Sequence, residues 1–134
     1  MGHDTQGLIR VLIVDDIKEM RESLRSILIA YPGMEVVSEA CDGEEAVLRV
    51  PQVKPSVVVM DINMPRLDGI RATVKIKQIF PHIVIIGISA YATDETCQVL
   101  RLAGTATVIS KDMAVNQLRT EILTSVHRRS TAFH

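Results

Sequence analysis

The chain has 134 residues, of which 15 are Lys or Arg and 16 are Asp or Glu, so its formal net charge is -1. This length fits one domain with its own core, and the balanced charge excludes a field that attracts nucleic acid or an anionic membrane. No apolar run is long enough to span a bilayer, and Cys41 and Cys97 lack metal-ligand spacing, which favours free thiols in a reducing compartment. We therefore expect a soluble, cytoplasmic domain at residues 8–127, with flexible tails at 1–7 and 128–134.

Strand-like runs rich in Val and Ile alternate with helix-like runs whose apolar residues recur every three or four positions. In chain order they predict a strand at 9–14, a helix at 17–28, a strand at 34–40, a helix at 44–50, a strand at 56–60, a helix at 70–80, a strand at 83–88, a helix from Thr93 to Gly104, a strand at 106–110 and a last helix at 115–126. Pro51 and Pro55 are expected to close off the second helix, and Arg21 to lie on the polar face of the first. Five strand-then-helix units predict an α/β fold, with a parallel sheet covered by helices on both faces.

Polar residues stand where the predicted strands end. They are Asp15 and Asp16 after the first strand, Asp61 after the third, Ser89 after the fourth and Lys111 after the fifth. All carboxyl ends of parallel strands lie on one edge of the sheet, where open α/β folds bind ligands. The sequence therefore predicts a site with three carboxylates, one hydroxyl and one ammonium group.

Clustered carboxylates repel each other unless a cation neutralises them, and a hard divalent ion with oxygen ligands does this best. Asp16, Asp61 and a backbone carbonyl near Asn63 would suit Mg²⁺ and leave room for a phosphoryl group. Lys111 and Ser89 could then hold the remaining phosphoryl oxygens. Taken singly, each of these residues is better explained as an ordinary turn, capping or surface residue. Only their combination at one edge favours the functional interpretation.

The chain resembles a response-regulator receiver domain of two-component signalling over roughly residues 8–126. The resemblance rests on Asp15-Asp16, the segment Met-Asp-Ile-Asn-Met-Pro at 60–65, Asp68-Gly69, Ser89-Ala90 and Lys111. It implies a flavodoxin-like (βα)5 doubly wound sheet of strand order 2-1-3-4-5. It also implies that Asp61 accepts a phosphoryl group from a phosphohistidine of a sensor histidine kinase or phosphotransfer protein. By the same likeness, Asp15, Asp16, Asp61 and the backbone carbonyl of Asn63 hold Mg²⁺, and Ser89 and Lys111 bind the phosphoryl oxygens.

The resemblance further implies an output surface made by the fourth helix, fifth strand and fifth helix, through which an output domain or a downstream protein is contacted. No enzyme activity is expected beyond self-phosphorylation and slow self-dephosphorylation. Tyr91 is expected to border the site. The sequence implies no direct contact with nucleic acid and no membrane contact, and it is compatible with a homodimer.

Two positions depart from the usual pattern. Many receivers carry Tyr or Phe three residues before the lysine, and Val108 occupies this position, so the aromatic part of the switch is missing. Either the receiver signals mainly through Ser89 and backbone movement, or its on and off states differ less. Asp112 follows Lys111 where Pro is common, which is similar to LuxR/NarL-type receivers. We therefore expect the regulatory domain of a LuxR-type transcriptional regulator, or a stand-alone receiver; residue 127 onwards reads like the start of a linker, which favours the former.

Two other classes of protein remain as alternatives. A pseudo-receiver would keep the fold as a protein-binding module without phosphorylation, and Val108 leaves room for it. A haloacid-dehalogenase-type phosphohydrolase also uses an Asp nucleophile and Mg²⁺, but it needs a second Asp two residues later, where this chain has Asn63. Because an amide cannot act as a general acid or base, this alternative is the weaker one.

Overall fold

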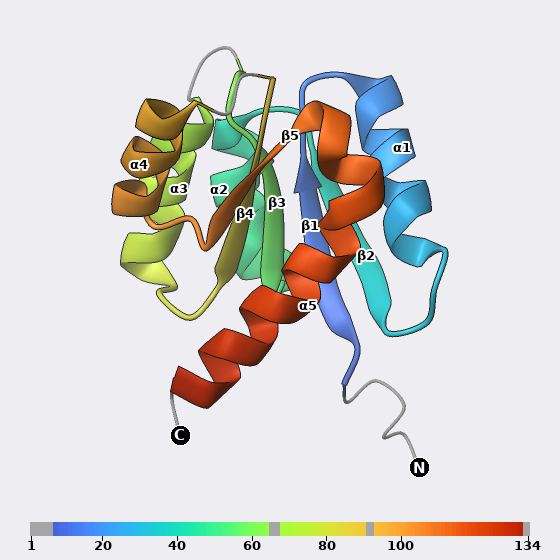
Figure 1. The fold of residues 1–134 in the computed structure, drawn as a ribbon. Coiled ribbons are helices and arrows are strands. Elements are labelled where there is room, and N and C mark those ends of the chain that lie inside the picture. Colours follow the sequence, from blue (N-terminus) through green and yellow to red (C-terminus); the bar gives the residue numbers. More distant parts are fainter. Residues whose placement is uncertain (1–6, 65–67, 91–92, 133–134) are drawn as a thin grey trace.

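A computed structural model describes residues 7–64, 68–90 and 93–132. In these residues the chain alternates strands and helices (Figure 1). The strands are β1 (Ile9–Val14), β2 (Met34–Ala40), β3 (Val57–Asp61), β4 (Val84–Ser89) and β5 (Thr107–Ser110). The helices are α1 (Lys18–Ile29), α2 (Gly43–Val53), α3 (Gly69–Ile79), α4 (Asp94–Ala103) and α5 (Ala114–Ala132), with a short 3-10 turn, η2, at Lys111–Met113.

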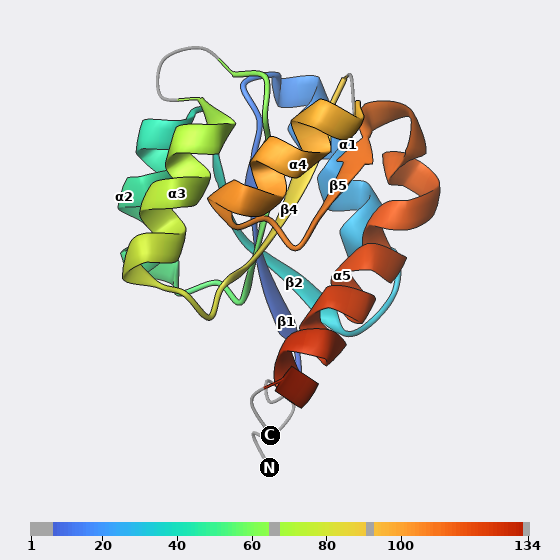
Figure 2. The ribbon, with the colours of Figure 1, turned by 60° about the vertical axis from the view of Figure 1, so that its left-hand side comes forward.

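The strands form one parallel sheet of order β2-β1-β3-β4-β5. The order confirms the predicted flavodoxin-like fold. Figure 2 shows α1 and α5 on one face of the sheet and α2, α3 and α4 on the other. Since both faces are covered, the central strands must be apolar on both sides, and every residue of β3 and β4 is buried.

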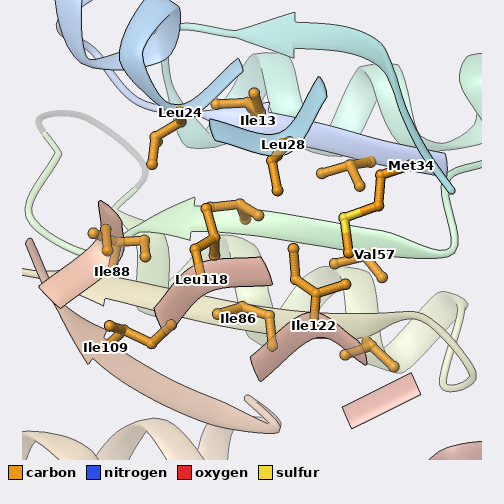
Figure 3. Close-up of a cluster of buried hydrophobic side chains, with 14 residues drawn as sticks. Ile13, Leu24, Leu28, Met34, Val57, Ile86, Ile88, Ile109, Leu118 and Ile122 are labelled. Carbon is orange, nitrogen blue, oxygen red and sulfur yellow. The ribbon is translucent and has the colours of Figure 1, made fainter. Parts of the chain in front are cut away.

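The pleat of the strands sends alternate residues into two separate cores. In β1, Val11 and Ile13 enter the core under α1 and α5, whereas Leu12 and Val14 enter the core under α2, α3 and α4. Figure 3 shows the first core, where Leu24 of α1 and other side chains from α5 pack against the sheet. The two cores fix the sheet between its helices and so fix the positions of the strand ends.

The last turns of two helices differ from the predicted ones. The prediction that Pro51 closes the second helix is wrong, because α2 continues through it to Val53. Pro51 has no N–H to donate to the carbonyl four residues back, and Lys54, three residues after Pro51, ends the helix in a left-handed conformation with φ 49°. A proline this close to a helix end removes one hydrogen bond without preventing the final turn.

The last helix also extends beyond the predicted domain boundary at residue 127. Residues 128–132, which the sequence assigned to a flexible tail, belong to α5. The segment contains neither Gly nor Pro, and Arg129 Nη1 donates to the carbonyl oxygen of His82 at 3.1 Å, which attaches this part of the helix to the start of β4. No helix in the described part of the chain is both long and apolar enough to cross a membrane.

Candidate functional site

The polar residues predicted at the strand ends do meet at one edge of the sheet, the upper edge in Figure 1. Asp15 and Asp16 follow β1, Asp61 is the last residue of β3, Ser89 is the last residue of β4, and Lys111 follows β5. The parallel register places these ends side by side, with Asp61 opposite Ile88 and Ser89 opposite Ser110. The topology alone therefore assembles the site.

Three carboxylates form the centre of this site. One ligand oxygen from each of Asp15, Asp16 and Asp61 lies within 4.8 Å of the others. Asp15 and Asp61 are 0% and 1% exposed, whereas Asp16 is exposed. Two buried carboxylates at this spacing repel each other at neutral pH, so the cluster is suited to a cation.

Each buried carboxylate has one oxygen that accepts a hydrogen bond and one that does not. Asp15 Oδ1 accepts from the Ile17 N–H at 2.9 Å, and Asp61 Oδ1 accepts from the Asn63 N–H at 3.0 Å. The Oδ2 atoms of both residues are buried and accept no hydrogen bond. Lys111 Nζ lies 3.7 Å from Asp61 Oδ2, which is an ion pair but too long for a hydrogen bond. Two buried carboxylate oxygens that accept no hydrogen bond from the described residues, beside an exposed carboxylate, are a donor set suited to a hard cation such as Mg²⁺.

Burial raises the pKa of both inner carboxyl groups. The pKa of Asp61 rises from 3.8 to about 6, mainly because burial penalises its charge and also because Asp15 lies nearby; the Asn63 N–H and Lys111 oppose the rise. The pKa of Asp15 is raised too, again chiefly by burial, against the lowering effect of the Ile17 N–H. Without a cation, ionisation of the two inner carboxyl groups therefore lowers the stability of the folded protein.

Asn63 joins the β3 end of the site to the β4 end. Its side-chain Oδ1 accepts from Ser89 Oγ and from the Ala90 N–H, both at 3.3 Å. The predicted role of its backbone carbonyl as a metal ligand stays a prediction. Tyr91 and Pro65, which the sequence places beside the site, lie outside the described residues. Asn63 thus restrains the hydroxyl that was predicted to bind a phosphoryl group.

We expect Asn63→Ala to loosen the start of the loop after β4. The Ala90 N–H would lose an acceptor, and a neutral hydrogen bond contributes about 0.5–1.5 kcal/mol, so the exchange of this amide hydrogen should rise by about two- to tenfold. Hydrogen exchange followed by NMR measures it. Asn63→Asp keeps an acceptor oxygen and is the control. Unchanged exchange at Ala90 in the alanine variant would show that the contact does not restrain the loop.

Val108 occupies the predicted switch position in β5. It is half-buried, lies opposite Gly87 of β4, and packs against the core under α2, α3 and α4. The position is as predicted, and its role as part of a switch stays a prediction. A valine has no ring that could move between a buried and an exposed rotamer, so Ser89 is the polar switch candidate at this edge.

Two residues that contact the site were missed or misplaced by sequence reasoning. The expectation that Arg21 lies on the polar face of α1 is wrong, because it is half-buried and its Nη1 donates to the carbonyl oxygen of Asp15 at 2.8 Å. Arg21 precedes the buried Leu24 and Leu28 by three and seven residues, which is the spacing of one helix face, so the sequence did carry a signal for its position. Gly69 packs so closely against the end of β3 that a Cβ there would lie 2.3 Å from the Asp61 carbonyl oxygen. Its place after Asp68 was read only as a helix start.

A family model described as the response regulator receiver domain matches residues 11–123 of this chain. The chain belongs to this family. Its receiver domain is similar to segments of two curated proteins. It is 50% identical over 60 residues to protein-glutamate methylesterase/protein-glutamine glutaminase 4 of Geobacter metallireducens, covering 45% of this chain and 17% of that protein. It is 49% identical over 63 residues to the Thermotoga maritima enzyme of that name, covering 47% and 18%. The matches thus span less than a fifth of these relatives.

Solved receiver structures cover nearly the whole chain. The response regulator domain of Thermotoga maritima CheB is 35% identical, with a TM-score of 0.76, covering 91% of this chain and 96% of that one. A LuxR-family response regulator from Aurantimonas sp. SI85-9A1 is 29% identical, with a TM-score of 0.87, covering 91% and 87%. A chain of the CheX-CheY-BeF3-Mg complex of Borrelia burgdorferi is 26% identical, with a TM-score of 0.82, covering 90% and 96%. The receiver domain is therefore similar to receivers from proteins with different outputs.

Proposed function

We propose that this receiver accepts a phosphoryl group on Asp61 from a phosphohistidine of a sensor kinase or phosphotransfer protein, in a reaction that depends on Mg²⁺. The observation that carries the proposal is the buried carboxylate of Asp61, which shares a three-carboxylate cluster with Asp15 and Asp16 and has Lys111 Nζ at 3.7 Å. A carboxylate nucleophile, an acidic cation site and a lysine in one place are the groups that phosphoryl transfer needs.

Asp15, Asp16, Asp61 and the backbone carbonyl of Asn63 are the residues that would hold Mg²⁺. The Oδ2 atoms of Asp15 and Asp61, which are buried and accept no hydrogen bond from the described residues, support this fit. When bound there, the ion would offset the charge of the carboxylates and of the phosphoryl oxygens.

In the proposed transfer, a carboxylate oxygen of Asp61 forms a bond to phosphorus while the bond from phosphorus to the histidine nitrogen breaks. The electron pair leaves with the imidazole, which takes up a proton. Lys111 is 25% exposed in its side chain and already faces Asp61, so it can bind a phosphoryl oxygen without being moved from the interior. Ser89 would exchange its contact with Asn63 for a second phosphoryl oxygen. Apart from this self-phosphorylation and a slow self-dephosphorylation, we propose no enzyme activity.

The second part of the proposal concerns output. We propose that phosphorylation changes the surface formed by α4, β5 and α5. This surface would contact an output domain or a separate protein in the cytoplasm. The receiver itself would act as a monomer or as a homodimer. Large apolar side chains are exposed on these helices, with Val99 at 49%, Leu102 at 87% and Val115 at 68%. Asp112 and the LuxR-family neighbour support a transcriptional regulator, whereas the curated relatives are methylesterases. A stand-alone receiver would use the same surface to contact a separate protein.

The test is intact-mass measurement after incubation with acetyl phosphate, in Mg²⁺ and in EDTA. We expect the mass of one phosphoryl group to be added in Mg²⁺ only, and not to Asp61→Asn. Beryllofluoride with Mg²⁺ should shift the backbone amide resonances of Ser89 and of β5. If no group is added and Mg²⁺ causes no shifts, the pseudo-receiver alternative replaces the proposal. Sustained turnover of a free phosphomonoester would instead support a phosphohydrolase.

A further inference from the structure

Arg21 contacts the acidic site through the backbone of Asp15 and not through a carboxylate group. Its Nη1 donates to the carbonyl oxygen of Asp15 at 2.8 Å, so it holds the peptide bond that joins Asp15 to Asp16. The orientation of that peptide determines where both carboxylates point.

The guanidinium of Arg21 is itself fixed by β2. Its Nε donates to Glu39 Oε1 at 3.1 Å, and Arg25 Nε donates to Glu39 Oε2 at 3.0 Å. The side chains of Arg21 and Glu39 are 17% and 28% exposed, so this pair is better shielded than a typical surface ion pair. Glu39 belongs to β2 and lies opposite Ile13 of β1 in the sheet register. Its ion pair with Arg21 therefore attaches the guanidinium to a strand of the sheet.

The loop after β1 has few other restraints. The Asp15 N–H donates to the Ala40 carbonyl at 3.1 Å, which is the last contact with β2. The N-cap residue of the following helix, α1, is Ile17, whose side chain makes no capping hydrogen bond. Asp15 Oδ1 accepts from the Ile17 N–H instead, whereas Asp15 Oδ2 accepts no hydrogen bond from the described residues. The Arg21 contact is thus the one described side-chain contact on the Asp15 carbonyl oxygen.

We infer that Arg21 is a positioning residue, held by Glu39, that fixes the Asp15–Asp16 peptide in the conformation that binds the divalent cation. This inference rests on the proposed function, because it assumes that the acidic cluster binds Mg²⁺. Side chains that support metal ligands from outside the coordination sphere commonly change metal affinity by about 10- to 100-fold.

The charge of Arg21 and its contact act on Mg²⁺ affinity in opposite directions. Its positive charge repels the ion, so removing the charge alone should tighten binding, by about threefold at this exposure and less in salt. Loss of the contact to Asp15 should weaken binding. The sign of the change in Arg21→Gln therefore separates a positioning residue from a bystander charge.

The test is the dissociation constant for Mg²⁺, obtained by NMR titration of the Asp16 and Ile17 amide resonances. We expect Arg21→Gln to weaken binding at least about fivefold and to accelerate hydrogen exchange at Ile17. Arg21→Lys keeps the charge but cannot bridge Asp15 and Glu39 as a fork, so it should also weaken binding. Arg25→Gln, which removes the same charge and also contacts Glu39 but not Asp15, should leave binding unchanged or tighter. Thermal unfolding in EDTA shows that each variant is folded.

The outcomes separate failure of this inference from failure of the proposed function. If Arg21→Gln and Arg25→Gln both bind Mg²⁺ as tightly as the wild type or more tightly, Arg21 acts only as a charge and the inference is overturned. If the wild type itself shows no Mg²⁺-dependent shifts, the proposed function fails, and the inference fails with it. Weakening in Arg21→Gln and Arg21→Lys, but not in Arg25→Gln, is the result that supports positioning.

Discussion

Asp61→Asn should make the cation-free protein more stable at pH 7, although it removes the proposed phosphoryl acceptor. The pKa of Asp61 is raised from 3.8 to about 6 in the folded state, chiefly by burial, so folding must keep a charge where it is disfavoured. A shift of this size corresponds to roughly 3 kcal/mol at pH values above both pKa values, at 1.36 kcal/mol per pKa unit. We expect a gain of about 1–3 kcal/mol, and the raised pKa already includes the opposing effect of Lys111.

This gain should depend on pH in a defined direction. Above pH 6 the carboxyl group is ionised in both the folded and the unfolded state, and the penalty is complete. Between about 6 and 3.8 the folded state binds the proton more tightly, so the stability contributed by Asp61 rises as the pH falls. The advantage of Asp61→Asn should therefore shrink from pH 7 to pH 5 and vanish near pH 4.

Urea unfolding in EDTA at pH 7 and pH 5 measures this effect. Asp16→Asn is the matched control, because it removes a carboxylate from the same cluster that is exposed instead of buried, and it should give a smaller gain. Adding Mg²⁺ should stabilise the wild type more than Asp61→Asn, since a ligand that binds only the folded state raises its stability. An Asn variant that is no more stable than the wild type at pH 7 would contradict the proposed burial cost.

Gly69→Ala should be strongly destabilising and should also disable the site. Gly69 is the first residue of α3 and is buried, and a Cβ there would lie 2.3 Å from the Asp61 carbonyl oxygen and 2.7 Å from Ile62 Cα. Both are backbone atoms, so no side-chain rotation can relieve the overlap. Overpacking of a buried position commonly costs about 1–3 kcal/mol of unfolding free energy. Because the backbone would have to move in this variant, we expect a loss of about 3 kcal/mol or more. The displaced backbone carries Asp61, so phosphoryl acceptance should fall as well.

Gly87→Ala provides a matched buried-glycine control. A Cβ at Gly87 would meet the Ile62 side chain at 3.4 Å and Val108 Cγ2 at 3.5 Å, which are ordinary contact distances with atoms that can move. Denaturant unfolding should show a loss within about 1 kcal/mol for this variant. Similar losses for the two alanine variants would mean that the approach of Gly69 to Asp61 is not what restricts this position.

Much of the fold was predictable because the strands are short, apolar and clearly bounded. The predicted strands at 9–14 and 34–40 coincide with β1 and β2. Short continuous runs of Val and Ile are typical of strands whose side chains are buried on both faces of a sheet, which is why the parallel arrangement followed from composition and pattern. The carboxylates at the strand ends then met without any further information, because parallel topology requires it.

Features that depend on tertiary contacts were not predictable from local pattern. Arg21 and Glu39 are 18 residues apart and belong to a helix and a strand, so no spacing rule relates them. Val115 has the helical spacing of a core residue but is 68% exposed, whereas Ala114 is buried in its place. A small side chain at the start of α5 lets the helix approach the sheet, and hydrophobicity alone does not reveal this choice. In the continuation of α5 past residue 127, Arg129 likewise contacts His82, which is 47 residues away in the sequence.

The direction of α5 has a practical consequence. The helix ends, and β1 begins, at the edge of the sheet opposite the three carboxylates (Figure 1). A fluorescent label or a tether placed after Ala132 or before Ile9 would therefore stand a full strand length away from Asp61. Such a fusion leaves the acidic edge open to a phosphohistidine donor, so transfer can be followed on immobilised or labelled protein without blocking the approach of the donor.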